Sequence, residues 1–403
     1  MMLLGIETSC DETAAAVVRK DTNDKSVILL ANTISSSLSL HAKTGGIIPE
    51  VAAREQLKYI LPVIKQTLLK GVNWDMEKNL KSQPPIDEIA VTVGPGLIGS
   101  LLVGVETART LSYVWNKPLI PVNHLFGHIY ANWIADSSVI SRSEATRDPN
   151  GISRYARNDK HVAFPALVLV VSGGHTDLVL MKNHDDITVL GGTRDDASGE
   201  AFDKIGRLLG LSYPAGPIIT KLAEKGDPKS LLFPRPLIGS DDFDFSFSGL
   251  KTAVLNLIKK NGWEFNNVIL GRTPESSLFV DSGQSQNDEK SKQLLSDLCA
   301  SVQEAIVDVL VTKTLKAAKQ YKAKSLLLGG GVAANQRLRE QFALSSGAGS
   351  RSAGKLEIDF FVPPAKLCTD NAAMIAAAAC FHNNSVSWHT ISADPELYFK
   401  QPT

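Results

Sequence analysis

The sequence predicts an α/β protein built from layers of sheet and helix, and three observations support this fold class. Short apolar strand patterns alternate with longer segments whose apolar residues recur at helical spacing. Glycine-rich turns follow several of these strands. A strand–turn–strand pattern near the N-terminus occurs again about 160 residues later, which indicates an internal duplication of an α/β unit.

The two copies of this pattern are the clearest predicted elements. Residues 3–9 (LLGIETS) and 14–18 (AAAVV) predict two strands joined by a polar turn. Residues 166–171 (ALVLVV) and 178–180 (LVL) predict a second pair, joined by the turn SGGHT. The other predicted elements, in order, are helix 50–70, strand 86–93, glycine-rich turn 94–100, helix 101–115, helix 293–321, strand 325–328, glycine turn 329–331 and a further helix.

The chain has 403 residues, enough for two or three domains that each bury a core. Four polar stretches rich in Ser, Asn, Asp or Gly interrupt the pattern. We expect these surface insertions to be disordered or functional loops. They lie near residues 71–84, 136–161, 261–292 and 345–355.

The composition excludes several classes of protein. Apolar residues make up 43% of the chain, and 42 Lys and Arg balance 42 Asp and Glu, which is typical of a globular chain. No apolar run approaches the roughly 18 residues of a membrane span, and the N-terminus lacks a signal-peptide pattern. The zero net charge argues against general binding of nucleic acid through excess positive charge. The four cysteines form no C-x-x-C pair, which excludes a thiolate zinc site of ordinary spacing and predicts free thiols in the cytoplasm.

Three glycine-rich turns follow apolar strands, at residues 94–100, 172–175 and 329–331. Such turns present backbone N–H groups to a phosphate, and three of them in one chain favour a nucleotide cleft over ordinary turns. None has the spacing of a P-loop or of a Rossmann fingerprint, so neither of those nucleotide-binding modes is supported.

His124 and His128 lie four residues apart, which places both imidazoles on one face of a helix, as a divalent metal requires. The alternative is a pair of histidines with structural or surface roles. No Glu follows His124, so the pair is not the HExxH of zinc proteases. Asp370, just before a helix of small residues, is a candidate third ligand. Its alternative role is the N-cap of that helix.

An acidic cluster at residues 195–203 contains Asp195, Asp196, Glu200 and Asp203. One interpretation is the start of a solvated helix, where the helix dipole favours acidic side chains. The other is that Asp203 accepts hydrogen bonds from ribose hydroxyls. Spacing alone leaves both interpretations open.

Seven motifs follow one another along the chain: GIETSCDET at 5–13, GPGL at 94–97, NHLFGH at 123–128, VSGGHT at 171–176, GEAFDK at 199–204, FSFSGLK at 245–251 and CTDN at 368–371. Together they resemble the tRNA N6-adenosine threonylcarbamoyltransferases of the bacterial TsaD type, a family once described as glycoproteases. The resemblance runs from about residue 3 to about residue 382, with the insertions outside it.

The resemblance implies an ASKHA (actin/hexokinase-like) fold of two duplicated lobes with an active-site cleft between them. We expect one lobe at 1–122 and the other at 123–403, with a final helix that can pack back on the first lobe. The implied reaction transfers threonylcarbamoyl from threonylcarbamoyl-adenylate to N6 of the adenosine 3′ of the anticodon, in tRNAs that read codons beginning with A.

The resemblance also implies roles for residues of this sequence. His124, His128 and Asp370 would bind one divalent metal ion per subunit, iron or zinc, and Asp11 and Glu12 would be catalytic residues near the reacting group. Three positions depart from the family pattern: Asn123 replaces a non-ligand His, while Ala215 and Ala334 replace Gly and Ser beside the adenylate. The implied substrate-binding residues are Val170, Val171, Ser172, Gly173 and Gly174 for the phosphate, Asp203 and Gly216 for the ribose, and Asn335 for the nucleobase.

The implied partners are tRNA, a TsaB-like inactive paralogue and a TsaE-like P-loop ATPase, or a second copy in a homodimer, with no membrane. One alternative is an ATP-dependent small-molecule kinase of the same fold, which has no evident use for a His-His-Asp triad. A zinc protease is disfavoured by the missing HExxH. An inert scaffold paralogue is disfavoured because the candidate metal residues are present.

Overall fold

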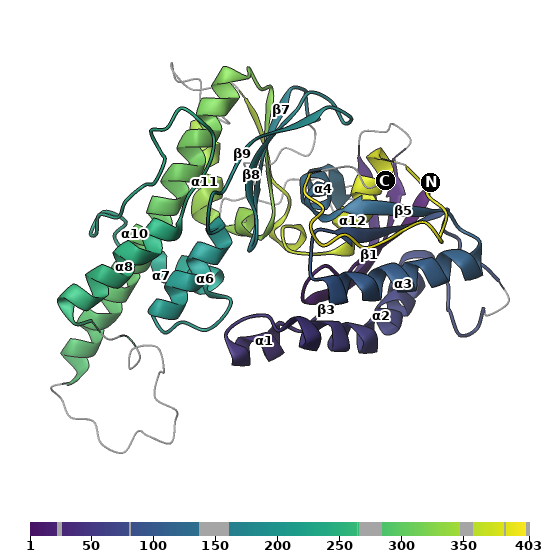
Figure 1. The fold of residues 1–403 in the computed structure, drawn as a ribbon, viewed down its shortest axis with the longest axis horizontal. Coiled ribbons are helices and arrows are strands. Elements are labelled where there is room, and N and C mark those ends of the chain that lie inside the picture. Colours follow the sequence, from purple (N-terminus) through teal and green to yellow (C-terminus); the bar gives the residue numbers. More distant parts are fainter. Residues whose placement is uncertain are drawn as a thin grey trace, which may run out of the picture.

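The computed structural model describes residues 1–21, 26–79, 82–136, 161–263, 265, 284–346, 358–382 and 384–399. Two mixed β-sheets form the centres of two lobes, with helices on their outer faces (Figure 1). The parts of the predicted insertions that fall in 80–81, 137–160, 266–283 and 347–357 lie outside the described residues.

The first sheet comprises β1 (Met2–Glu7), β2 (Glu12–Lys20), β3 (Val27–Ser36), β4 (Glu88–Gly94), β5 (Leu119–Asn123) and β6 (Ile134–Asp136). Their order is β5-β4-β1-β2-β3-β6. β1 and β2 are antiparallel, as are β2 and β3, whereas β4 runs parallel to both β1 and β5. Continuous apolar runs form β1, β2 and β4 because layers cover both faces of this sheet.

The second sheet comprises β7 (Ala166–Val171), β8 (Thr176–Met181), β9 (Ile187–Gly192), β10 (Ser325–Gly329) and β11 (Asp359–Phe361). Its order is β11-β10-β7-β8-β9, with the same strand directions as β5-β4-β1-β2-β3. The predicted α/β class and internal duplication are confirmed, and the shared topology is that of the two-lobed ASKHA fold.

Three helices belong to the outer side of the first lobe: α1 (Leu38–Thr44), α2 (Pro49–Val72) and α3 (Ile98–Trp115). Ile64 and Leu68 of α2 join the core that covers Leu4 on the outer face of the sheet. Trp74 packs edge-on against Trp115, with ring centroids 5.8 Å apart. The expectation of a disordered loop at 71–84 is therefore wrong for residues 71–79, because a buried tryptophan ties them to the lobe.

The outer side of the second lobe carries the long helix α10 (Gln284–Gln320), which starts inside the predicted insertion 261–292. Together with its neighbours it buries the outer face of the second sheet in a separate apolar core. The neighbouring helices are α6 (Ser198–Leu208), α7 (Ala215–Ala223), α8 (Ser248–Asn261) and α11 (Gln336–Ser345).

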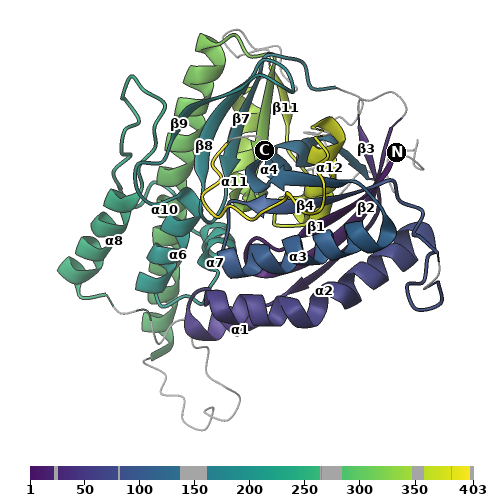
Figure 2. The same ribbon diagram turned by 45° about the vertical axis from the view of Figure 1, so that its right-hand side comes forward.

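Two short helices, α4 (His124–Tyr130) and α12 (Ala372–Phe381), lie between the sheets (Figure 2). They share one apolar core with Leu3 of the first sheet and Val168 of the second. The alanine-rich α12 contacts β1 closely: a Cβ added at Gly5 would lie 2.3 Å from the carbonyl oxygen of Ala372. This close approach brings the start of α12 next to the turn after β1.

The C-terminal segment 384–399 contacts both lobes. Asp394 N donates to Val93 O at 2.7 Å, and Gly96 N donates to Pro395 O at 3.3 Å, on the first lobe. Tyr398 Oη donates to Asp177 Oδ1 of β8 at 2.6 Å, on the second lobe. Because elements after residue 123 pack on both sheets, the lobe boundary at 122/123 stays a prediction. No helix among the described residues is long and apolar enough to cross a membrane.

Candidate active site and metal centre

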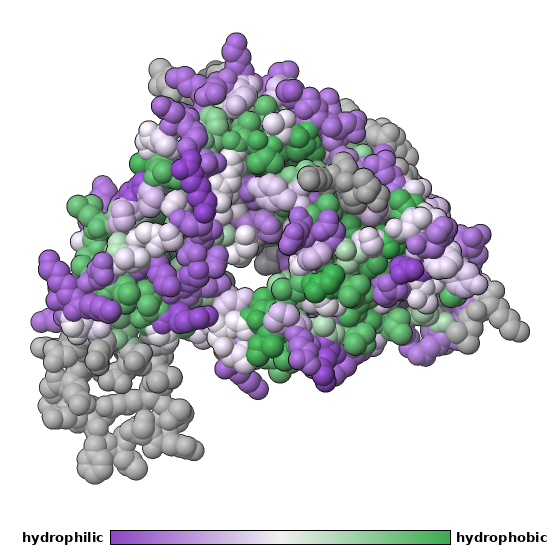
Figure 3. Space-filling view, viewed as in Figure 1, coloured by the Kyte–Doolittle hydropathy of each residue, from purple (hydrophilic) through white to green (hydrophobic). Residues whose placement is uncertain are grey.

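Two cavities adjoin in the cleft between the lobes, which the space-filling view shows as a hollow (Figure 3). The Asp203 cavity has a volume of about 390 Å³ and lies mostly within the second lobe. The Asp370 cavity, of about 350 Å³, faces both lobes. The two cavities share four lining residues, Gly173, Pro214, Gly331 and Thr369.

All three glycine-rich turns reach these cavities, as a nucleotide cleft requires. Gly96 lines the Asp370 cavity, while Gly173 and Gly331 line both cavities. The turn after β10 demands glycine: Gly330 has φ +91°, and a Cβ there would lie 2.2 Å from the carbonyl oxygen of Val171. The turn after β7 is closed by Ser172 N, which donates to His175 O at 2.8 Å.

His124 and His128 both lie on α4, so the prediction that a helix presents them on one face is confirmed. Their ring centroids are 4.6 Å apart and both side chains are buried. The helix starts at Asn123, whose Oδ1 accepts a hydrogen bond from Leu125 N at 2.8 Å. Asn123 is therefore the helix cap beside the histidines.

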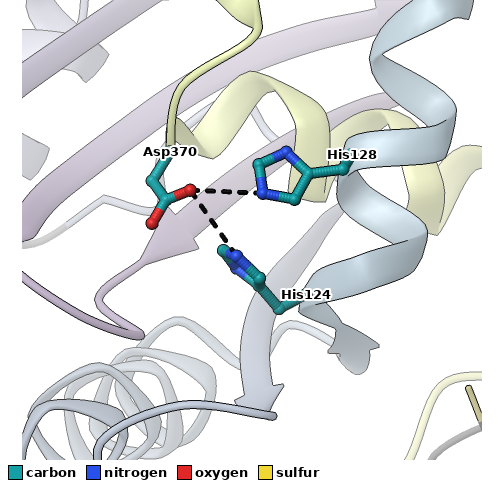
Figure 4. A group of neighbouring side chains, drawn as sticks. All are labelled: His124, His128 and Asp370. Carbon is teal, nitrogen blue, oxygen red and sulfur yellow. Dashed lines mark ion pairs between the residues drawn. The ribbon is translucent and has the colours of Figure 1, made fainter. Parts of the chain in front are cut away.

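Asp370 completes a cluster with the two histidines (Figure 4). Its Oδ1 lies 3.5 Å from His124 Nε2 and 3.3 Å from His128 Nε2. The alternative role of helix cap is wrong for Asp370, because Asn371 caps α12 by accepting from Met374 N at 3.1 Å. The carboxylate of Asp370 is thereby left to face the histidines.

Glu7, at the end of β1, was not among the predicted site residues. Its Oε2 lies 3.1 Å from His124 Nδ1 and accepts from Thr92 Oγ1 at 2.5 Å, and its side chain is 1% exposed. The one sequence signal that could have identified Glu7 is its position as a charged residue at the end of an apolar strand. In the neutral imidazole, a proton on Nδ1 can be donated to the Glu7 carboxylate, which leaves the lone pair of Nε2 to bind a metal ion.

The cluster has the chemistry of a divalent metal site. The three ligand atoms lie within 4.8 Å of one another, and two imidazoles with one carboxylate suit zinc or iron. Both ring nitrogens of His128 are buried: within the described residues Nδ1 has no hydrogen-bond partner, and Nε2 faces only the Asp370 carboxylate at 3.3 Å. Burial alone would lower the pKa of His124, but the carboxylates of Asp370 and Glu7 raise that pKa.

Asp11, at the end of the turn after β1, and Glu12, the first residue of β2, both line the Asp370 cavity. Burial, together with the charges of Asp370 and Asp11, raises the pKa of Glu12 well above its ordinary value. The structure brings both predicted catalytic residues to the same cavity as the histidine cluster; their roles stay predictions.

The predicted substrate-binding residues are only partly brought together. Asp203, Gly216 and Asn335 line the Asp203 cavity, and Gly173 and Gly174 line the Asp370 cavity beside Ser172. Asp203 Oδ1 accepts from Ala215 N at 2.7 Å, and burial raises the pKa of this carboxyl. Both ends of the Asn335 amide are already bonded, to Thr220, Gln303 and Leu338. Val170 and Val171 are buried in β7 and line neither cavity.

Several further lining residues were missed by sequence reasoning. Tyr213 and His175 line the Asp370 cavity, and Thr369 lines both cavities. Burial and the neighbouring His124 and His128 imidazoles lower the pKa of His175 to about 4, so this ring is neutral at pH 7. His175 and Thr369 each lie inside a motif of the sequence, next to a residue that was named for its chemistry.

Comparison with known proteins agrees with this geometry. The sequence model of the TsaD family, described as tRNA N6-adenosine threonylcarbamoyltransferase, matches residues 28–142 and 151–377. A protein of that name from Thermomicrobium roseum is 44% identical over 382 residues, covering 94% of this chain and 92% of its own. Another from Bacillus subtilis is 42% identical over 383 residues, covering 94% and 89%.

Among solved structures, component A of (R)-2-hydroxyglutaryl-CoA dehydratase from Acidaminococcus fermentans covers 95% of this chain and 97% of its own, at 13% identity and a TM-score of 0.43. The activator of 2-hydroxyisocaproyl-CoA dehydratase from Clostridium difficile, with bound ADPNP, covers 95% of each chain at 11% identity and a TM-score of 0.43.

Proposed function

We propose a function from one premise: the chain belongs to the family of tRNA N6-adenosine threonylcarbamoyltransferases. The proposed reaction transfers threonylcarbamoyl from threonylcarbamoyl-adenylate to N6 of the adenosine 3′ of the anticodon, in tRNAs that read codons beginning with A. The observation that carries the proposal is the meeting of three glycine-rich turns and a His-His-Asp cluster at two adjoining cavities.

The donor is assigned to both cavities. Its adenosine occupies the Asp203 cavity, where Gly216 and Asn335 also line the wall. Its phosphate lies at the shared wall near Gly173, where backbone N–H groups stabilise negative charge. The threonylcarbamoyl group then extends into the Asp370 cavity, toward the histidine cluster.

The reaction is an acyl transfer to an amine. The N6 nitrogen attacks the carbamoyl carbon, a C–N bond forms, the C–O bond to the phosphate breaks, and AMP leaves. Because the donor is already activated, no serine or cysteine nucleophile is needed, and the protein contributes orientation and charge stabilisation. Asp11 and Glu12 form the pair to which we assign the movement of the N6 proton.

His124, His128 and Asp370 would hold the divalent ion, with Glu7 orienting His124. When bound, such an ion supplies a Lewis acid that binds a carboxylate or polarises a carbonyl. The protein's own contribution is to keep the three ligand atoms together in a buried pocket and to fix the tautomer of His124 through Glu7.

The test is a reconstituted reaction with tRNA, threonine, bicarbonate, ATP and a threonylcarbamoyl-adenylate synthase, with and without a TsaB-like paralogue and a TsaE-like ATPase. Nucleoside mass spectrometry should detect threonylcarbamoyladenosine in the tRNA. Absence of the product with all partners present would overturn the proposal. Rapid ATP-dependent phosphorylation of a small molecule, with unmodified tRNA, would instead support a kinase.

The proposal also includes the identity of the metal, the cellular compartment and the partner proteins. The metal is iron or zinc, one ion per subunit, and the compartment is the cytoplasm, with which the four free cysteines agree. The chain acts with a TsaB-like paralogue and a TsaE-like ATPase or as a homodimer. Metal analysis of the purified protein tests the first assignment, its mass in solution with and without these partners tests the assembly, and microscopy of the tagged protein in cells tests the compartment.

A further inference from the structure

We propose that Arg339 is a positioning residue that fixes the position of the two cavities relative to each other. From α11 its guanidinium ties the turn that lines the Asp203 cavity to the loop that carries Asp370. The proposal rests on the function proposed above and extends it, because it names the group that connects the donor cavity with the metal cluster. Arg339 itself lines neither cavity.

The guanidinium of Arg339 makes three contacts with two separate segments. Its Nε donates to the carbonyl oxygen of Ala333 at 2.6 Å, in the 3-10 turn Gly331–Ala334 after β10. Its Nη2 donates to the carbonyl oxygen of Pro363 at 2.8 Å and lies 3.1 Å from Cys368 Sγ, in the loop after β11. One partly buried side chain thus joins the two segments.

Each segment supplies residues that face the cavities. Gly331, Val332 and Ala334 of the first segment line the Asp203 cavity, as does Asn335 directly after it. The second segment continues through Cys368 to Thr369, which lines both cavities, and to Asp370, which faces the histidines. A shift of either segment relative to the other would move the donor wall relative to the metal ligand.

Arginine suits this task better than lysine. Its planar fork presents Nε and Nη2 donors at fixed spacing, so the carbonyl oxygens of Ala333 and Pro363 are held at a set separation. An ammonium donates its three hydrogens from one freely rotating nitrogen, so it does not hold two acceptors at a set separation. Loss of the guanidinium removes the hydrogen bonds to the carbonyl oxygens of Ala333 and Pro363. The loop Pro363–Asp370 then loses its link to α11 and to the turn after β10.

The same helix provides a matched control. Arg337 also lies on α11 and is also partly buried, and its guanidinium binds both oxygens of Glu304 at 2.7 Å. None of its contacts reaches the turn after β10 or the loop after β11. Arg337→Gln therefore removes a charge and an ion pair from the same helix without releasing either segment.

The experiment compares wild type, Arg339→Gln, Arg339→Lys and Arg337→Gln. Zn²⁺ affinity is measured by competition with a chromophoric chelator, AMP affinity by calorimetry, and folding by thermal unfolding. We expect Arg339→Gln to weaken Zn²⁺ binding about 10-fold to 100-fold, as for outer partners of metal ligands, and to weaken AMP binding together with it. Arg337→Gln should keep both affinities within about twofold, because its contacts lie elsewhere.

The outcomes separate the two proposals. Folded Arg339→Gln with both affinities unchanged would overturn the positioning role, even if wild type forms threonylcarbamoyladenosine. If Arg339→Gln unfolds, Arg339→Lys decides: weakened binding of both ligands supports the role, and unchanged binding overturns it. Equal losses in Arg337→Gln also count against it. Wild type that binds Zn²⁺ and AMP but never modifies tRNA would overturn the proposed function alone.

Discussion

A single buried carboxylate, Glu7, connects the first strand of the chain to the candidate metal ligand His124. Its second oxygen, Oε1, accepts from the backbone N–H of Ser9 at 2.5 Å, and Ser9 Oγ lies 3.2 Å from His124 Nδ1. The imidazole is therefore held by two groups, one at the end of β1 and one in the turn that follows it. Such support fixes the direction of the free ring nitrogen before any ion binds.

Glu7→Gln should weaken metal binding by about tenfold or more, because a neutral amide both orients His124 less strongly and lowers the basicity of its free nitrogen. Competition with a chromophoric chelator measures the Zn²⁺ affinity of the variant and of wild type. Glu106→Gln, at a side chain that is 57% exposed, is the control and should bind the ion like wild type. Equal affinities for Glu7→Gln and wild type would show that His124 needs no such support.

Asp177 gives a prediction about pH. Burial raises the pKa of its carboxyl from 3.8 to about 6, although the Tyr398 hydroxyl opposes the shift. Since the folded-state pKa lies above the unfolded value, this contribution to stability is fully present below about pH 3.8 and is lost as pH rises through about 6. At neutral pH the ionised carboxylate then costs about 3 kcal/mol.

Asp177→Asn cannot ionise, so the variant should gain stability relative to wild type by about 1–2 kcal/mol between pH 5 and pH 8. Denaturant unfolding at both pH values measures the difference, and any pH-independent cost of the amide cancels. Asp241→Asn, at a fully exposed carboxylate, should show no such trend. A stability difference that is the same at both pH values would contradict the assignment.

At this scale, sequence reasoning found residues that lie inside recognisable motifs. The spacing of His124 and His128 was enough to place both on one helix face, and Asp370 was identified with them. Glu7 could not be found in the same way, because its partner lies far along the chain and only the packed fold brings them together. The hydrogen bonds of Asn335 to Thr220 and Gln303 could not be predicted either, because they join residues that are distant in the sequence.

At the scale of elements, the docking of α12 on β1 depends on the absence of a side chain at Gly5. A Cβ there would lie 2.3 Å from the carbonyl oxygen of Ala372 and 2.9 Å from Ala376 Cβ. Both neighbours belong to a helix that is buried along its length. The helix also starts two residues after Asp370, so its position determines where the candidate ligand lies.

Gly5→Ala should destabilise the protein by about 1–3 kcal/mol, because the added methyl group must push α12 away from the sheet. Denaturant unfolding measures the loss. Gly239→Ala introduces the same methyl group where no atom of the described residues lies within 4 Å of the added Cβ, and should leave stability nearly unchanged. Similar unfolding midpoints for Gly5→Ala and wild type would show that α12 moves freely.

Elements with strong periodicity were predicted well, and elements without it were not. The helix expected at 50–70 is α2 (Pro49–Val72), and the strand expected at 86–93 is β4 (Glu88–Gly94). By contrast, β3 was not predicted, because its residues are mostly half-buried and do not alternate between two faces. Its strand character comes from pairing with β2 rather than from its own pattern.

At the scale of the whole molecule, the net charge is zero, and some lysines of the most basic stretch bind other parts of the protein. The stretch 313–324 holds five lysines without an acid. Lys313 is buried, and its Nζ donates to Leu237 O at 2.9 Å and to Ser240 Oγ at 2.7 Å. Lys316 Nζ donates to Ser240 O at 2.8 Å. Both side chains bind the segment 237–242, and the buried Lys313 is not available as a surface for RNA.

The isolated chain should therefore bind tRNA with a shallow salt dependence, a slope of log K against log salt on the order of −2. Few phosphates can be neutralised by a surface whose positive charge is balanced by acids. Titrations at several salt concentrations, with and without partner proteins, measure the slope, which should steepen when partners add basic surface. A slope near about −6 for the isolated chain would contradict this.

In the proposed function, the two adjoining cavities and the His-His-Asp cluster form one threonylcarbamoyl-transfer site. Single-turnover transfer from preformed threonylcarbamoyl-adenylate to tRNA, with partners present and product followed by nucleoside mass spectrometry, tests it most directly. We predict product with wild type and with His389→Ala, at an exposed histidine, and a rate at least about 100-fold lower with folded His128→Ala. Equal rates for wild type and His128→Ala, or no product from wild type, would contradict the account.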